Sequence, residues 1–99
     1  MSVTKYDVDK MRAVAHILAG EVYYLAGDGI QNPVSLICLD EAIRNEETAR
    51  GWDADGETGA ARRARCQIGS YLMDAARIER MDGNDAVADA LENIRLATN

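Results

Sequence analysis

The chain has 99 residues and a formal net charge of -6, from 17 acidic and 11 basic side chains. This length is typical of one domain, so we expect residues 1–99 to fold as a single unit. The acidic balance argues against direct nucleic-acid binding by broad phosphate neutralisation and favours a partner with a basic surface.

The first predicted helix spans residues 5–26. Its apolar positions follow a three-four spacing from Val8 to Leu25, which places them on one face. The helix is nevertheless apolar over more than half of its circumference. One side of such a helix packs on its own chain, and the other is free to contact a second copy. Val14, Ile17 and Tyr24 are therefore candidates for an oligomer interface.

The second predicted helix spans residues 33–50. It begins at a strong start signal, because asparagine at position 32 is a preferred cap and proline at position 33 fits the first helical turn. Leu36, Leu39 and Ile43 form its apolar stripe. The stripe does not continue, since the next inward positions carry charged side chains.

Residues 51–59 are rich in glycine and aspartate and predict a turn. A third helix is then predicted over residues 59–82, with Ile68, Leu72 and Ile78 on its apolar face. Gly83 ends it, and a last helix is predicted over residues 85–97 with a short apolar edge that includes Leu91.

These elements predict an all-α fold, a small antiparallel helical bundle of about four helices. No segment alternates with period two for long enough to predict a strand, and the connections are short. The apolar fraction is 47%, but it includes sixteen alanines and no phenylalanine, so the core must be thin. Because self-association buries additional apolar surface, we expect a homodimer or larger homo-oligomer.

The hairpin between the second and third helices carries charges of both signs around the only tryptophan. One interpretation is that the acidic and basic side chains pair along the stem, in contacts worth under about 1 kcal/mol each when exposed. The other is a recognition tip, because exposed tryptophan and arginine are typical of interface hot spots. The two are compatible. The candidate partner-binding residues are Glu46, Glu47, Arg50, Trp52, Asp53, Asp55, Arg62, Arg63 and Arg65.

A second candidate face lies on the third helix, away from its apolar stripe. It brings together Arg62, Cys66, Gly69, Met73, Arg77 and Arg80. This is either a solvated face or a contact surface for an acidic partner, a phosphate-bearing ligand or a second copy. Met73 and Arg77 join the candidate oligomer interface for that reason.

The motifs of catalysis and metal binding are incomplete in this sequence. The acidic run at residues 53–57 is out of register with a calcium loop, whose twelfth position would fall on Arg62. His16 is the only histidine, and Cys38 and Cys66 have no ligand spacing, so no zinc site and no cofactor are expected. Glu79 and Asp82 supply only half of the paired acidic motifs found in helical nucleotide pyrophosphatases.

The sequence therefore favours a small non-enzymatic protein-binding module, an inhibitor or adaptor of the kind that phages and mobile elements direct at host nucleic-acid machinery. One alternative is an oligomeric nucleotide- or anion-binding protein that uses Arg62, Arg63 and Arg65 at a helix N-terminus. A helical metal-dependent nucleotide hydrolase is a further alternative. With no apolar run of membrane-spanning length and no signal segment, we expect a cytoplasmic protein.

Overall fold

The computed structural model describes residues 4–26, 34–94 and 97–98, and the side chains of residues 6–20 and 34–94. This part of the chain forms five helices and two short strands. In chain order they are β1 (Thr4–Lys5), α1 (Val8–Ala26), α2 (Val34–Ala54), α3 (Thr58–Arg65), α4 (Ile68–Met81), α5 (Asp85–Glu92) and β2 (Ala97–Thr98).

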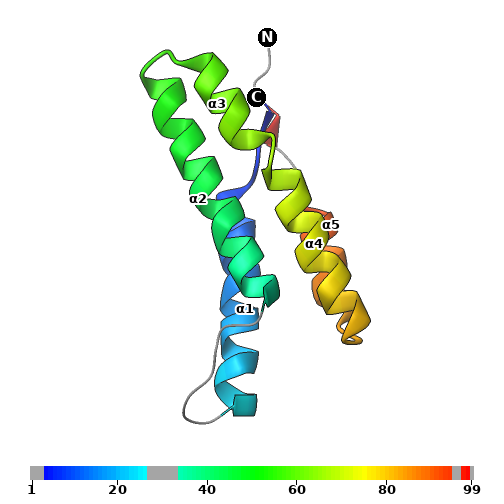
Figure 1. Cartoon of the computed structure of the whole chain (residues 1–99). Helices are drawn as coiled ribbons and strands as arrows, with labels where there is room; N and C mark the ends of the chain where they lie inside the picture. Colours follow the sequence, from blue (N-terminus) through cyan, green and yellow to red (C-terminus); the bar gives the residue numbers. More distant parts are fainter. Residues whose placement is uncertain (1–3, 27–33, 95–96, 99) are drawn as a thin grey trace.

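α1, α2, the pair of α3 and α4, and α5 alternate in direction along the molecule, so the predicted all-α antiparallel bundle is confirmed. α2 is the central element, packing against α1 on one side and against α3 and α4 on the other (Figure 1). α3 and α4 follow one another along the same side of α2, and α5 returns against α4. The result is elongated, with principal extents of 45 × 25 × 18 Å.

The core is a single cluster of small and medium apolar side chains. Met11, Leu18, Leu39, Ile68 and Leu91 are its largest fully buried members, and they come from α1, α2, α4 and α5. Each lies on the apolar face that the three-four spacing predicts. Buried alanines on α2, α4 and α5 fill the remaining positions and let these helices approach closely.

α2 is longer than predicted, because it continues to Ala54 and includes Gly51 and Trp52. The chain reverses two residues later at Gly56, whose φ of +78° is a left-handed conformation that glycine adopts without strain. The turn expected at residues 51–59 is thus shorter and lies nearer to α3. Trp52 consequently lies in the last turn of a helix and not in a loop.

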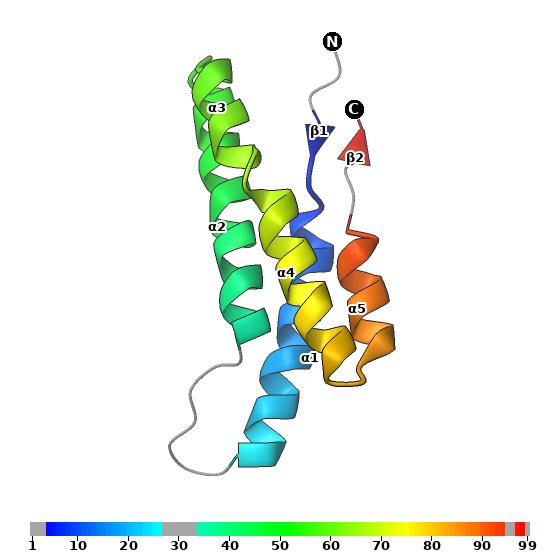
Figure 2. The same ribbon diagram turned by 45° about the vertical axis from the view of Figure 1, so that its right-hand side comes forward.

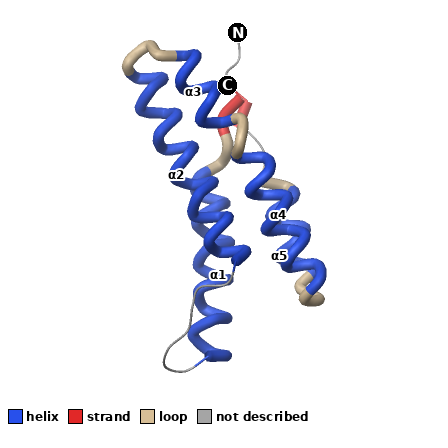
Figure 3. Tube along the Cα trace, viewed as in Figure 1, coloured by secondary structure: helices blue, strands red, loops and turns tan. Residues whose placement is uncertain are grey.

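The prediction of one continuous third helix is wrong. It is divided at Cys66 and Gln67 into α3 and α4, a break that is visible between the two helices (Figure 3). Arg62, Arg63 and Arg65 therefore lie in the last turn of α3. Cations at that end interact favourably with the helix dipole, the reverse of what a continuous helix implied.

The two ends of the described chain meet. The last helix stops at Glu92 instead of residue 97, and β2 pairs with β1 in an antiparallel ladder that places Thr4 opposite Thr98 and Lys5 opposite Ala97 (Figure 2). The first helix likewise begins at Val8, not at residue 5. Strands of two residues have no alternation that a sequence pattern can reveal.

None of the helices that the structure describes combines the length and the apolar character that crossing a bilayer requires.

Candidate functional site

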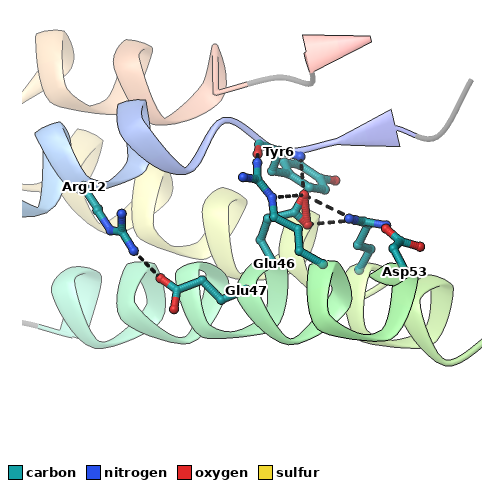
Figure 4. A network of polar contacts seen from close by, with 7 residues as sticks. Tyr6, Arg12, Glu46, Glu47 and Asp53 are labelled. Carbon is teal, nitrogen blue, oxygen red and sulfur yellow. Dashed lines mark hydrogen bonds and ion pairs between the residues drawn. The ribbon is translucent and has the colours of Figure 1, made fainter. Parts of the chain in front are cut away.

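A buried ion pair closes the stem of the α2–α3 hairpin. Glu46 on α2 is fully buried, and its carboxylate accepts a hydrogen bond from Nε of Arg65 at 2.7 Å (Figure 4). The same carboxylate accepts one from the backbone N–H of Tyr6 at 2.8 Å. Nη1 of Arg65 donates to Asp53 at 2.7 Å. Glu46 thus joins both helices of the hairpin to the segment that leads into α1.

The guanidinium of Arg65 is held charged by its two carboxylate partners. Burial disfavours its charged form, but the hydrogen bonds to Glu46 and Asp53 outweigh that effect and raise the pKa of Arg65. Its Nη2 is buried without a hydrogen-bond partner in the described part of the chain. Removing one member of such a buried pair costs far more than breaking an exposed pair.

These contacts correct part of the predicted partner-binding set. Glu46 and Arg65 are enclosed by their own chain, and Asp53 is turned toward Arg65, so all three stabilise the stem and are not available as a contact surface. Pairing along the stem was one of the two interpretations of the sequence. It is confirmed for these residues, although as a buried network and not as exposed pairs.

Glu47 and Arg50 also contact the first segment of the chain, from more exposed positions. Arg12 on α1 donates to Glu47, and both side chains are about half exposed (Figure 4). Arg50 donates through Nη2 to the carbonyl oxygen of Tyr6 at 2.9 Å. These residues dock α1 and its leading segment on α2, and only part of each side chain remains open to solvent.

Around this network, several side chains near the end of the hairpin are solvent exposed. Trp52 is 42% exposed, and Asp55, Arg62 and Arg63 are exposed as well. The two arginines make no ion pair with any described carboxylate. We call these four residues the tip surface.

Two backbone features fix the geometry of the tip surface. The N–H of Glu57 donates to the carbonyl oxygen of Trp52 at 2.8 Å, which holds the tryptophan next to the turn. A Cβ placed on Gly59 would lie 3.7 Å from Nη1 of Arg63, so that guanidinium folds back over the first turn of α3. The backbone of Trp52 is therefore fixed next to the turn, and the Arg63 guanidinium lies over the first turn of α3.

The arginine cluster does not lie at the helix N-terminus that the predicted anion site required. That site required Arg62, Arg63 and Arg65 near the amide groups of a helix N-terminus, where the dipole attracts anions. They lie instead at the C-terminal end of α3, and Arg65 is buried against Glu46. The placement of these residues was predicted wrongly because a continuous helix pattern hid the break at residues 66–67.

Glu79 has a structural role in the arrangement observed. It is 3% exposed and accepts hydrogen bonds from Oγ of Ser35 at 2.9 Å and Nδ2 of Asn84 at 3.2 Å. It thus joins the start of α2 to the start of α5. Among the described residues, no three His, Cys, Asp or Glu side chains gather in a way that could hold a metal ion.

The candidate oligomer interface is also revised. Val14 is 6% exposed and belongs to the core of its own chain, so it cannot contact a second copy. Ile17 and Met73 are exposed by 51% and 61%, and Arg77 is exposed. The side chain of Tyr24 lies outside the described residues.

Several contacts carried no signal in the sequence. Ser35 is fully buried, and Tyr6 contributes backbone groups that no residue pattern marks. Arg80 donates to Glu92 and Asp89, which raise its pKa.

Both cysteines are free. The pKa of Cys38 is raised mainly by burial and to a smaller extent by the nearby Asp74.

Comparisons of the chain with protein-family models, with curated proteins and with solved structures found no match.

Proposed function

We propose that this chain is a non-enzymatic protein-binding module that contacts its partner through the tip surface. One observation carries the proposal: Trp52 stays 42% exposed at the end of a hairpin whose stem is closed by the buried pair of Glu46 and Arg65. Indole and guanidinium groups dominate the binding energy of many protein interfaces. Here both kinds of group are exposed near the end of the hairpin, and neither Trp52 nor Arg62 and Arg63 belong to the buried network.

The buried network also favours binding by rigidity. Loops that must be ordered when a complex forms reduce its affinity, because their lost conformational freedom opposes association. Glu46, Arg65 and Asp53 fix the two helices against each other before any partner arrives. A partner therefore meets Trp52 on a helix end that is already positioned.

The charges suggest which kind of surface the tip fits. Arg62 and Arg63 form no ion pair with a described carboxylate. A carboxylate of the bound protein would therefore accept two parallel hydrogen bonds from each guanidinium. The chain as a whole is acidic, with a net charge of -6, and this charge steers the encounter with a partner that is basic around the contact. A module without catalysis changes its partner's activity by blocking or by bridging, which favours an inhibitor or an adaptor.

Affinity capture with three versions of the purified chain tests this proposal. The wild type, Trp52→Ala and Met81→Ala are immobilised at equal density in a lysate of the encoding organism, and captured proteins are quantified by mass spectrometry. Met81 is the matched control, because it is 81% exposed but lies at the far end of α4. We expect Trp52→Ala to lose a specific protein at least tenfold, since a hot-spot truncation costs about 2 kcal/mol or more.

The control must retain that protein, and circular dichroism must show all three versions equally helical. Equal capture by the wild type and Trp52→Ala would contradict the proposed role of the tip surface.

A further inference from the structure

α3 is attached to the rest of the chain by small side chains and by charges. Among the described residues, the apolar core that joins α1, α2, α4 and α5 includes no side chain of α3. Ala61 is 1% exposed and is the fully buried apolar side chain of this helix, while Ala60 and Ala64 are half-buried. Alanine has little apolar surface to remove from water, so packing alone stabilises α3 only weakly.

The backbone of α3 is separated from its neighbours at both ends. Gly56 reverses the chain before it, and its N-cap residue makes no side-chain capping hydrogen bond with a described group. At the other end, the N–H of Cys66 donates to the carbonyl oxygen of Arg62, whereas the N–H of Tyr71 donates to that of Gln67, on either side of the break (Figure 3). A helix of eight residues is too short to be stable alone in water. α3 therefore depends on its contacts with α2.

The strongest of these contacts are those of Arg65, and they are costly to form. Its Nε donates to Glu46 and its Nη1 to Asp53, both at 2.7 Å. Burial removes the hydration of Arg65 and Glu46, and Nη2 of Arg65 is buried with no hydrogen-bond partner in the described chain. Opening of α3 returns these groups to water, which offsets part of the lost attraction. Opening therefore costs less free energy than global unfolding, which also disrupts the apolar core.

We propose that α3 opens from α2 as a unit while the apolar core stays folded, with the contacts of Arg65 to Glu46 and Asp53 as its latch. The closed form predominates, and in that form the hairpin is rigid. The two exposed arginines of the tip surface lie on α3 and Trp52 lies on α2, so opening separates them. The latch thereby controls whether the tip surface is assembled, a step that rests on the function proposed above.

Hydrogen exchange at increasing urea concentration, followed residue by residue by NMR, tests the opening in the absence of any partner. The amides of residues 61–66 are bonded within α3, and those of residues 72–81 within α4. We expect protection factors about tenfold or more lower in α3 than in the best-protected part of α4, with a weaker dependence on urea, because a local opening exposes less surface than global unfolding. Equal protection and equal urea dependence in the two helices would show that α3 does not open separately and would overturn the proposal.

Asp53→Ala and Asp55→Ala test the latch with the same change two residues apart. Of the two carboxylates, that of Asp53 bonds to Arg65, whereas Asp55 is exposed. We expect Asp53→Ala to lower the protection of the α3 amides about tenfold or more, and Asp55→Ala to change it by less than about twofold. A carboxylate near the C-terminal end of α2 opposes the helix dipole, so faster exchange in Asp53→Ala cannot be attributed to a loss of helix stability at that position.

Equal α3 protection in the two variants would overturn the role of the latch. Exchange is measured without a partner, so this result is independent of the capture experiment. Separate opening of α3 together with equal capture by the wild type and Trp52→Ala would contradict the proposed function and leave the latch in place.

Discussion

Glu46 and Glu47 are neighbours on α2 whose surroundings differ completely. Glu46 is fully buried and accepts hydrogen bonds from Arg65 and from the backbone of Tyr6. Glu47 is about half exposed and pairs with Arg12. A carboxylate in water already has favourable solvation, so the exposed pair contributes little, whereas the buried one must keep its partners to compensate for lost hydration.

This difference predicts a large contrast in stability between two adjacent substitutions. Glu46→Ala leaves Arg65 with Asp53 alone and the Tyr6 amide without its acceptor, and should lower the free energy of unfolding by about 3 kcal/mol or more. Glu47→Ala should lower it by less than about 1 kcal/mol. Urea unfolding followed by circular dichroism measures both. Equal losses in the two variants would mean that the Glu46–Arg65 pair does not hold the stem.

The sequence alone could not show which groups form hydrogen bonds with Glu46. The helical period places position 46 on the inward face, and the arginines downstream supply a counter-charge. The pattern does not show that a backbone amide 40 residues earlier completes the site. Nor does it separate Arg65, which is buried, from Arg62 and Arg63, which are exposed.

At the scale of the elements, glycine has two different roles in this chain. Gly83 lies between α4 and α5 with a φ of +86°, in the left-handed region that side chains disfavour. Gly51 lies inside α2, where an added Cβ would have no neighbour within 4 Å. The first glycine is required by the turn, and the second only weakens a helix.

Alanine substitutions at these two positions should therefore change stability in opposite directions. Gly83→Ala is expected to lower the free energy of unfolding by about 1 kcal/mol, because alanine is strained at that φ. Gly51→Ala is expected to raise it by about 0.5 kcal/mol or more, because alanine favours helix. Thermal and urea unfolding report both changes. A stabilising Gly83→Ala would show that the α4–α5 turn does not adopt this conformation.

Glycine signals explain which boundaries the sequence predicted well. Gly83 ended the third predicted helix near Met81, as observed, because it lies in a turn that needs it. Gly51 was likewise taken to end the second predicted helix, but α2 continues through it to Ala54. The break at Cys66 and Gln67 had no glycine or proline to mark it. Local patterns therefore located the helices better than their ends.

At the scale of the whole molecule, the helical order was predictable and the shape was not. Short connections between amphipathic helices predict antiparallel neighbours, which the structure confirms. The spacing does not reveal that α3 and α4 share one side of α2. This arrangement depends on contacts between residues far apart in the chain. The candidate site was correspondingly predicted in part: Trp52, Arg62 and Arg63 remain on the surface, and Glu46 and Arg65 do not.

The central claim is that no other element covers the end of the α2–α3 hairpin. The chain has a single tryptophan, so its fluorescence reports on that end alone. Acrylamide quenching is measured on the folded protein and on the urea-unfolded chain. We predict red-shifted emission and a quenching constant for the folded state that is a large fraction of the unfolded value. Blue-shifted emission with strong protection from quenching would show an enclosed indole and would contradict the claim.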